Sequence, residues 1–240
     1  MARTRPADRI AKLIDAAVAV FCRKGYRRTQ MADIASEMGV SPGSLYNYVA
    51  SKEALFFFAL ESGLVDDAFE EPAELPIRFR GHDAALKRFV DLTALDEKLP
   101  VLNAALRRGR STDPRAELES VTRELFDTIR RIRHLITLIE SSAADLPELA
   151  HLYFNLRESL IDRLSRYLAQ RVRTGQFRAV PDSRAAARLM IETINWFARV
   201  RYGDPSSKID DTLALATVLD FVSHALTREP DERAARHARA

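Results

Sequence analysis

The chain has 240 residues, of which 47% are hydrophobic and 30% charged, a composition typical of a folded globular protein rather than a disordered one. Its 37 lysines and arginines barely exceed its 34 acidic residues, and its single cysteine excludes an internal disulfide framework. The chain has only 8 glycines and 10 prolines, and four long stretches contain neither: 115–146, 148–174, 182–202 and 206–229. Such stretches are typical of long helices and unlike short strands joined by turns, so we predict an all-α fold of about ten helices.

Positive charge is concentrated at the N-terminus. Residues 1–52 carry nine lysines and arginines against four acidic residues, whereas the remainder carries 28 against 30. A basic segment on a slightly acidic body indicates that a polyanion binds the N-terminal part. The sequence contains no apolar run long enough to cross a membrane and no apolar signal core, and its cysteine content fits a reducing compartment. We therefore predict a cytoplasmic protein without a membrane partner.

Three helices are predicted at the N-terminus, followed by a fourth. The first spans 8–24, where apolar residues recur at helical spacing until a glycine ends the pattern. A short second helix is expected between Thr29, which can cap its start, and Gly39, which closes it. Ser41 can cap a third helix, and Ser51 can cap a fourth that continues to about residue 69. The region therefore has the outline of a small helical domain.

The rest of the chain is predicted to consist of further helices separated by short connections. These helices are expected at about 83–96, 98–108, 114–139, 147–174, 183–202 and 209–227. The connection at 70–82 contains two prolines and a glycine, and it is either an entrance to a ligand site or a plain connector. The tail from residue 229 lacks an apolar face and is predicted to be disordered.

Two short helices joined by the Gly-Val-Ser turn at 39–41 match a helix-turn-helix, whose second helix enters the major groove of DNA. Here that helix begins with the small residues at 42–44, which allow the backbone to approach DNA closely. Asn47 can donate to and accept from a base edge, and adenine is its best partner. The hydroxyls of Tyr46 and Tyr48 can reach phosphates. This motif predicts binding to double-stranded DNA.

Each of these features also has a plainer interpretation. Asn47 alone would be an ordinary exposed helix residue, and one of the two tyrosines can pack on the helix instead. Lys52 alone would be a solvated surface charge, although its position after Ser51 favours a phosphate contact. The N-terminal arginines Arg3, Arg5 and Arg9 either reach into a minor groove as an arm or form a simple soluble terminus.

Residues 25–55, GYRRTQMADIASEMGVSPGSLYNYVASKEAL, resemble the DNA-binding domain of the TetR family of regulators. The resemblance implies a homodimer that binds a palindromic operator, most often as a repressor, and that a small-molecule effector releases. It implies DNA contacts from Thr29, Gln30, Ser41, Pro42, Gly43, Ser44, Tyr46, Asn47, Tyr48 and Lys52. In this set Thr29 resembles a helix-cap phosphate contact, whereas Pro42, Gly43 and Asn47 resemble residues that face the bases.

The resemblance also implies a division of the chain into domains. Residues 1–52 would form the helix-turn-helix domain, 53–228 a helical effector-binding and dimerisation domain, and 229–240 the disordered tail. In this family the last two helices pair with those of the partner in a four-helix interface. The candidate interface residues are Leu189, Ile194, Phe197, Leu215, Val218, Phe221 and Val222, although the same periodicity fits a face that packs into the core.

Family analogy places the effector site inside the helical body. Polar or aromatic residues that interrupt its apolar faces are the candidates, namely His134, Glu140, His151, Tyr153, Asn155, Asn195 and Trp196. Each of them also fits an ordinary surface or core position.

Sequence signals for other classes of function are absent. The chain has neither a G-x-G-x-x-G nor a P-loop spacing, and it has no H-x-x-x-H pair. We therefore predict no enzymatic activity, no metal and no cofactor. Two alternatives to an effector-released repressor stay open. One is a helical ligand- or protein-binding module with vestigial DNA binding, and the other is an activator of the same architecture.

Overall fold

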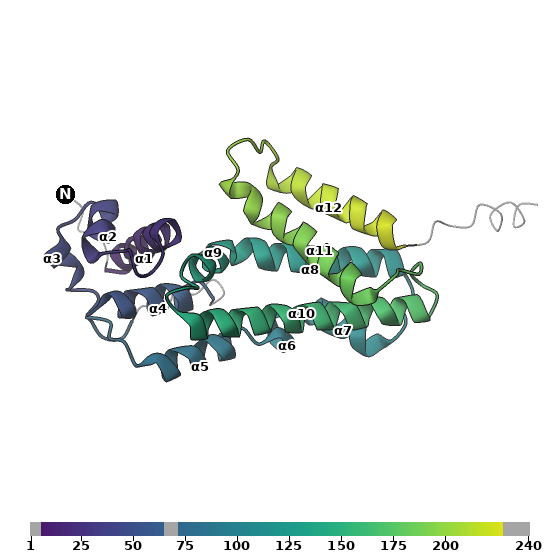
Figure 1. The fold of residues 1–240 in the computed structure, drawn as a ribbon, viewed down its shortest axis with the longest axis horizontal. Helices are drawn as coiled ribbons and strands as arrows, with labels where there is room; N and C mark the ends of the chain where they lie inside the picture. Colours follow the sequence, from purple (N-terminus) through teal and green to yellow (C-terminus); the bar gives the residue numbers. More distant parts are fainter. Residues whose placement is uncertain (1–5, 65–71, 228–240) are drawn as a thin grey trace, which may run out of the picture. The chain divides into compact units, whose positions relative to one another are not determined.

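The computed structural model describes residues 6–64 and 72–227. Within these ranges the chain is helical, with two isolated β-bridges instead of a sheet (Figure 1). The predicted all-α fold is therefore confirmed. The tail from residue 229 and the arginines Arg3 and Arg5 lie outside the described residues. Among the helices described, none combines the length and apolar character that a membrane span needs.

The contacts divide the chain into two compact units, each described separately below. The first comprises residues 1–94 and 132–156, and the second comprises 95–131 and 157–240. The functional boundary predicted at residue 52 falls inside the first unit and stays a prediction. The helices of the first unit are α1 (Pro6–Lys24), α2 (Met31–Met38), α3 (Pro42–Leu45), α4 (Lys52–Ser62), α5 (His82–Leu92), α9 (Arg133–Ser141) and the start of α10 (Pro147–Arg173).

The core of the first unit forms around α1, whose apolar stripe is buried against α2, α4 and α9. Ile10, Leu13 and Phe21 have no exposed surface. The ring of Phe21 meets that of Phe56 edge-on at 5.1 Å, and Tyr26 meets the same ring at 5.1 Å. Aromatic pairs of this geometry contribute about 0.5–1.5 kcal/mol each beyond their buried area, so this cluster fixes α4 against the end of α1.

The ends of the N-terminal helices follow the predicted pattern with one correction. Gly39 closes α2 in the left-handed conformation, with φ of 73°. The Ser51 side chain caps α4 by accepting from the Ala54 N–H at 3.1 Å. The cap predicted at Thr29 is wrong, because α2 has Gln30 at its N-cap and the Gln30 N–H donates to Asp33 at 2.9 Å. A carboxylate three residues into the helix thus satisfies the cap position.

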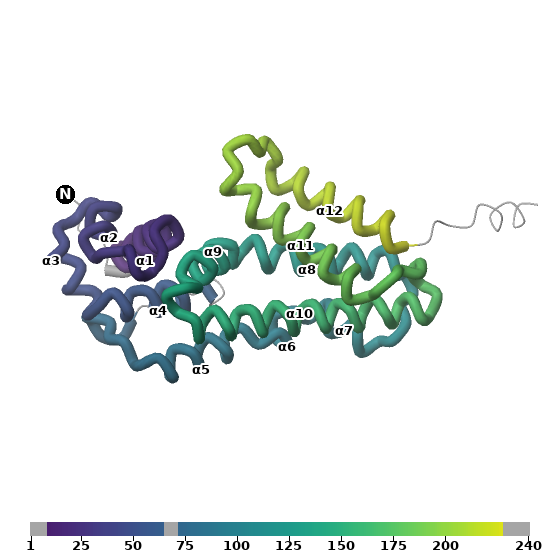
Figure 2. The backbone as a smooth tube through the Cα atoms, in the orientation of Figure 1, coloured from purple at the N-terminus to yellow at the C-terminus, as the bar shows by residue number. Residues whose placement is uncertain are grey.

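The second unit is built from helices packed around α8. Its elements are α6 (Leu95–Lys98), α7 (Pro100–Arg108), α8 (Pro114–Arg131), the remainder of α10, α11 (Ser183–Ala198), the 3-10 helix η1 (Val200–Gly203) and α12 (Asp211–Leu226). Figure 2 shows the backbones of α11 and α12 as neighbours, and both contact α8. Asp182 and Asp210 cap α11 and α12 by accepting the backbone N–H groups of Ala185 and Leu213.

Several predicted helices are shorter than expected: α4 ends at Ser62 instead of about residue 69, α5 ends at Leu92 instead of 96, and two longer ones change backbone within the predicted range. The single helix predicted at 114–139 is wrong, because the helix breaks at Ile132, where φ is −94° and ψ is 13°. A new helix, α9, follows at once, and its first N–H groups donate back to the Ile132 carbonyl. The helix predicted at 183–202 ends as α-helix at Ala198 and tightens into η1 over its last residues. Apolar periodicity continues through both sites and therefore does not reveal the change of backbone.

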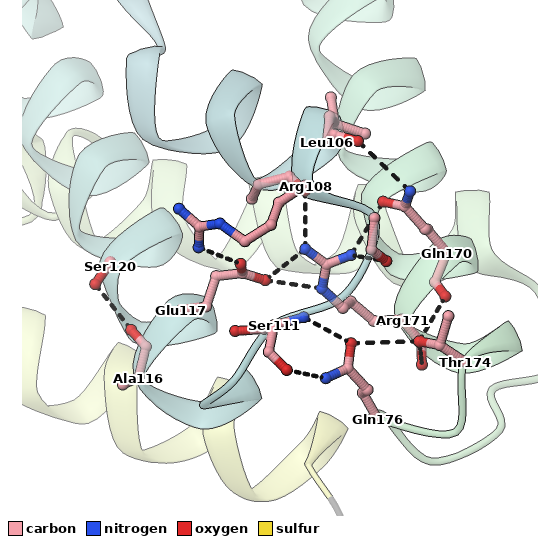
Figure 3. Close-up of polar contacts among 12 residues, drawn as sticks. Leu106, Arg108, Ser111, Ala116, Glu117, Ser120, Gln170, Arg171, Thr174 and Gln176 are labelled. Atoms are coloured by element: carbon pink, nitrogen blue, oxygen red, sulfur yellow. Dashed lines mark hydrogen bonds and ion pairs between the residues drawn. The ribbon is translucent and has the colours of Figure 1, made fainter.

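A buried ion pair ties three segments of the second unit together (Figure 3). Arg171, near the end of α10, is fully buried, and its guanidinium donates to the Glu117 carboxylate at 2.8 Å. It also donates to the carbonyls of Gly109 and Ala105 at 2.9 and 2.8 Å. Arg108 approaches the second Glu117 oxygen at 3.2 Å. The end of α7, the start of α8 and the end of α10 are thereby joined at one carboxylate.

Candidate DNA-binding interface

The turn between α2 and α3 leads into the short helix α3, which has one buried and one exposed face. The Val40 N–H returns to the Ala35 carbonyl at 2.9 Å, which closes α2 behind Gly39. Leu45 and Val49 have no exposed surface and anchor the following segment in the core. The residues between these anchors and before them are exposed, namely Ser41, Pro42, Gly43, Tyr46 and Asn47, while Ser44 and Tyr48 are half-buried. The buried pair therefore determines which side chains face outward.

The α3 segment is shorter and more tightly wound than predicted. Regular α-helix covers only Pro42–Leu45, and the chain continues in turns, with the Tyr48 and Val49 N–H groups both donating to the Leu45 carbonyl. Tyr46 is 51% exposed and its side chain is available to a partner molecule. The Tyr48 hydroxyl accepts from the Arg9 guanidinium at 3.3 Å. Arg9, one of the arginines interpreted either as a minor-groove arm or as a simple soluble terminus, thus lies beside the α3 segment.

Thr29 does not face the predicted DNA surface with its hydroxyl. The residue is 1% exposed, and its hydroxyl donates to the Gly25 carbonyl at 2.7 Å. This bond closes the turn between α1 and α2. The Thr29 hydroxyl is therefore not available for the predicted phosphate contact. Gln30, the next residue, is exposed and can reach a partner molecule.

Basic residues around α2 are partly neutralised within the domain. Lys24 approaches Asp33 at 2.7 Å and Arg23 approaches Glu37 at 2.7 Å. The hydrogen bond from Lys24, followed by that from the backbone N–H of Gln30, lowers the pKa of Asp33. Both ion pairs are exposed and contribute little to stability. Their acidic partners also reduce the positive charge that these two residues offer to a polyanion.

Lys52, predicted to contact a phosphate, uses its ammonium inside the protein. Its Nζ donates to the carbonyls of Tyr26 and Thr29 at 3.0 Å each and lies 3.4 Å from that of Arg27. The same atom lies 4.5 Å above the centre of the Tyr26 ring. In this conformation Lys52 holds the turn between α1 and α2. Its phosphate contact stays a prediction, and it requires the ammonium to leave these acceptors or to share its hydrogens with them.

The segment at 72–81 is attached to the residues that follow α3. Ile77 pairs with Val49 in a parallel bridge: the Ile77 N–H donates to the Tyr48 carbonyl at 2.8 Å, and the Ala50 N–H donates to the Ile77 carbonyl at 2.9 Å. The Phe79 ring stacks on Phe57 at 5.1 Å. The described part of the predicted connector is therefore a brace for the α3 segment, and residues 70–71 lie outside the described range. The sequence carried no signal for this pairing.

The residues predicted for effector binding do not form one constellation. In the first unit His134, His151 and Asn155 are exposed, while the Tyr153 hydroxyl donates to Glu140 at 3.2 Å. His151 lines a groove of about 640 Å³ between α5 and the start of α10, and the other candidates do not line it. In the second unit Asn195 accepts from Arg199 at 2.9 Å, and Trp196 packs edge-on against Phe197. Their role in ligand binding stays a prediction.

The structure gives the predicted interface residues very different degrees of exposure. Ile194 and Val218 have no exposed surface, so they are core residues and their prediction as interface residues is wrong. Leu189 and Phe221 are 64% and 63% exposed. Phe197 and Leu215 are half-buried, and Val222 is buried. Leu213 on α12, which is not among the predicted residues, is also 54% exposed, since periodicity does not distinguish a free apolar face from a packed one.

Comparison with known proteins agrees with this geometry. Residues 13–58, which span most of α1 through the middle of α4, match the family model described as bacterial regulatory proteins, tetR family. The chain is also 26% identical over 224 residues to the HTH-type transcriptional repressor KstR2 of Rhodococcus jostii, covering 88% of this chain and 90% of that one. The N-terminal part of this chain is therefore a TetR-family DNA-binding domain. The family predicted from residues 25–55 is thereby confirmed.

Further TetR-family similarities differ in extent. YfiR of Bacillus subtilis, an uncharacterised HTH-type regulator, is 43% identical over 56 residues, which cover 23% of this chain and 27% of that one. The structure of the ketosteroid regulator KstR2 of Mycobacterium tuberculosis has a TM-score of 0.57 at 22% identity and covers 94% of this chain and 98% of that one. AibR in complex with isovaleryl coenzyme A and operator DNA has a TM-score of 0.54 at 18% identity, covering 89% and 97%. Both structures support the shared fold.

Proposed function

We propose that this protein is a homodimeric transcriptional repressor that binds palindromic operator DNA through its α3 segment in the cytoplasm and that a small-molecule effector releases it. The observation that carries this proposal is the α3 segment itself. Leu45 and Val49 are completely buried, and this fixes Pro42, Gly43 and Asn47 outward, so that Asn47 presents its amide beside two small or rigid residues. A segment without bulky side chains at its start lets the backbone approach base edges and phosphates.

Asn47 is the residue we propose for base recognition. It is exposed, and its amide can form paired hydrogen bonds with an adenine edge in the major groove. Tyr46, which precedes it, is exposed enough for its hydroxyl to reach a phosphate. Together these residues would supply one base contact and one backbone contact from each recognition segment.

We expect Asn47→Ala to weaken discrimination at one base position of each half-site by about 1–3 kcal/mol while leaving weak non-specific binding almost unchanged. The measurement is fluorescence anisotropy on a palindromic duplex selected from a random library with the wild-type protein, together with its single-base variants. Asn155→Ala is the matched control, because it removes the same amide from an exposed position outside the α3 segment. An Asn47→Ala protein with unchanged base preference would show that another residue reads the operator.

The interface between two copies is proposed to form on α11 and α12. Leu189 and Phe221 leave most of their apolar surface exposed in one chain. They border a groove of about 270 Å³ whose lining also includes Ala185, Met190 and Ala225. Exposed apolar side chains around such a groove are typical of a surface that packs against a partner. A second copy in two-fold arrangement would present Phe221 to the same groove.

Dimer formation should be lost in Phe221→Glu, since a two-fold interface would bring two buried carboxylates into an apolar contact. We expect the variant to elute as a monomer at micromolar concentration, with helical content unchanged by circular dichroism. Val90→Glu is the control, because it places the same charge on another exposed apolar residue, 49% exposed on α5. A Phe221→Glu protein that stays dimeric would place the interface elsewhere.

Release by an effector requires a cavity that communicates with the α3 segment. We propose for this role the cavity of about 1120 Å³ between α4, residues 72–80 and α5. Phe57, Phe58 and Phe79 give it an aromatic lining, and its charged lining residues have both signs, with Arg80 and Arg88 as well as Glu61 and Asp91. Its lining also includes Ile77, which is hydrogen-bonded to the backbone next to Val49. An occupant that moves Ile77 would therefore shift the end of the α3 segment.

A further inference from the structure

The turn between α1 and α2, residues 25–29, is held by side chains from two other parts of the first unit. Lys52, the first residue of α4, donates to the carbonyls of Tyr26 and Thr29. From the other side, the Asp145 carboxylate accepts the backbone N–H of Arg27 at 2.8 Å. Asp145 lies in the connection between α9 and α10, 118 residues away in sequence. One short turn therefore has its carbonyls held by a cation and its N–H held by an anion.

The position of this turn determines where the helix-turn-helix begins. α2 starts at Met31, directly after the turn, and Gln30 forms its cap. The turn has no regular secondary structure of its own, so its geometry depends on these side-chain contacts and on the bond from Thr29 to Gly25. Nearby, the Ser141 hydroxyl donates to the Phe21 carbonyl at 3.2 Å, which adds a second link between the end of α9 and the end of α1.

We infer that Asp145 is a positioning residue for DNA binding: its carboxylate holds the turn at 25–29 and thereby the orientation of α2 and α3, without touching DNA itself. The inference rests on the proposed binding of DNA by the α3 segment. A hydrogen bond between a backbone N–H and a carboxylate is stronger than one between neutral groups, and it fixes both distance and direction. α10 begins at Pro147, two residues after Asp145, so the bond also links the start of that helix to the DNA-binding domain.

Electrostatics alone makes the opposite prediction for Asp145. It is an acidic residue in a protein that would bind a polyanion, so removing its charge should raise DNA affinity slightly if the residue had no structural role. If Asp145 has the proposed role, loss of its bond to Arg27 should instead lower the affinity for DNA. The turn would then be less ordered in the free protein, and ordering it on binding would use part of the binding free energy. The sign of the change in affinity therefore separates the two interpretations.

The test compares three variants on the palindromic duplex selected with the wild-type protein. Asp145→Ala removes both the charge and the acceptor, and we expect its dissociation constant to rise about tenfold. Asp145→Asn removes the charge but keeps an acceptor oxygen, and we expect binding close to that of the wild type. Glu148→Ala removes one negative charge from an exposed position in the first turn of α10, and we expect unchanged or slightly tighter binding.

Two further measurements keep the result interpretable. Thermal unfolding and the active fraction from stoichiometric titration separate a loss of folded protein from a loss of affinity in folded protein. The slope of log affinity against log salt should be the same for Asp145→Ala and the wild type, because no phosphate contact is lost. Asp145→Ala binding as tightly as Glu148→Ala would overturn the inference. A wild-type protein that enriches no duplex would instead overturn the proposed function.

Discussion

Glu117→Ala should destabilise the second unit by about 3–5 kcal/mol, because it leaves the Arg171 guanidinium buried without its anionic partner. The remaining acceptors of Arg171 are the backbone carbonyls of Ala105 and Gly109 and the side-chain amide oxygen of Gln170. All three are neutral and do not balance its charge. Arg108 would lose the same partner, but its side chain is more than half exposed and can turn to water. The free energy of unfolding, measured by urea titration with circular dichroism, checks this result.

The matched controls separate the buried pair from ordinary surface charges. Arg115→Ala breaks an exposed pair with Glu119 on the same helix and should cost less than about 0.5 kcal/mol. The double variant Glu117→Leu with Arg171→Met removes both buried charges and should recover a large part of the stability lost in Glu117→Ala. If Glu117→Ala cost no more than Arg115→Ala, the guanidinium would have to be solvated and the buried network would not hold this unit together.

Gly25→Ala should destabilise the first unit by about 2–4 kcal/mol, through two separate effects. Gly25 has φ of 76°, a left-handed conformation in which a side chain costs about 1–2 kcal/mol. A Cβ built at this position would also lie 2.7 Å from the Ser141 carbonyl oxygen, which is backbone and cannot rotate away. The end of α9 or the turn at 25–29 would have to move. Thermal and urea unfolding of the purified variant measure the loss.

Gly39→Ala isolates the first effect, the cost of the left-handed backbone conformation. Gly39 has φ of 73°, nearly the same backbone strain, but nothing lies within 4 Å of a Cβ built there. We expect this variant to lose only the conformational part, about 1–2 kcal/mol. The excess cost of Gly25→Ala then measures the close packing of α9 on the end of α1. Equal losses in the two variants would mean that this packing is loose enough to accommodate a methyl group.

The DNA-binding element could be predicted from sequence because local rules determine most of it. Glycine at positions 25 and 39, where φ is positive, and proline at the first position of α3 mark the helix ends through their own backbone preferences. The buried residues Leu45 and Val49 follow from helical spacing. These signals act within a few residues, so one sequence suffices to read them.

The candidate site was predicted less completely, because a side chain's partner can lie far away in sequence. Lys52 reads as a free surface charge, yet it donates to three carbonyls about 25 residues earlier. Asp145 lies two residues before α10, and its carboxylate accepts the backbone N–H of Arg27, 118 residues earlier. Such pairs produce no periodic pattern in the sequence, because the number of residues between the two partners follows no rule. Local propensity carries no information about them.

The sequence by itself determined the helical class, the helix-turn-helix and the family, since all three depend on short-range periodicity, capping residues and fixed spacing. Only the tertiary structure decided which apolar residues of α11 and α12 are core and which are free. Ile194 and Leu189 lie on one helix and are equally apolar, yet Ile194 has no exposed surface and Leu189 is 64% exposed. The difference arises because α8 and α12 cover one side of α11 and leave the other uncovered. Hydrophobicity describes what a residue prefers, whereas burial depends on which neighbours the fold supplies.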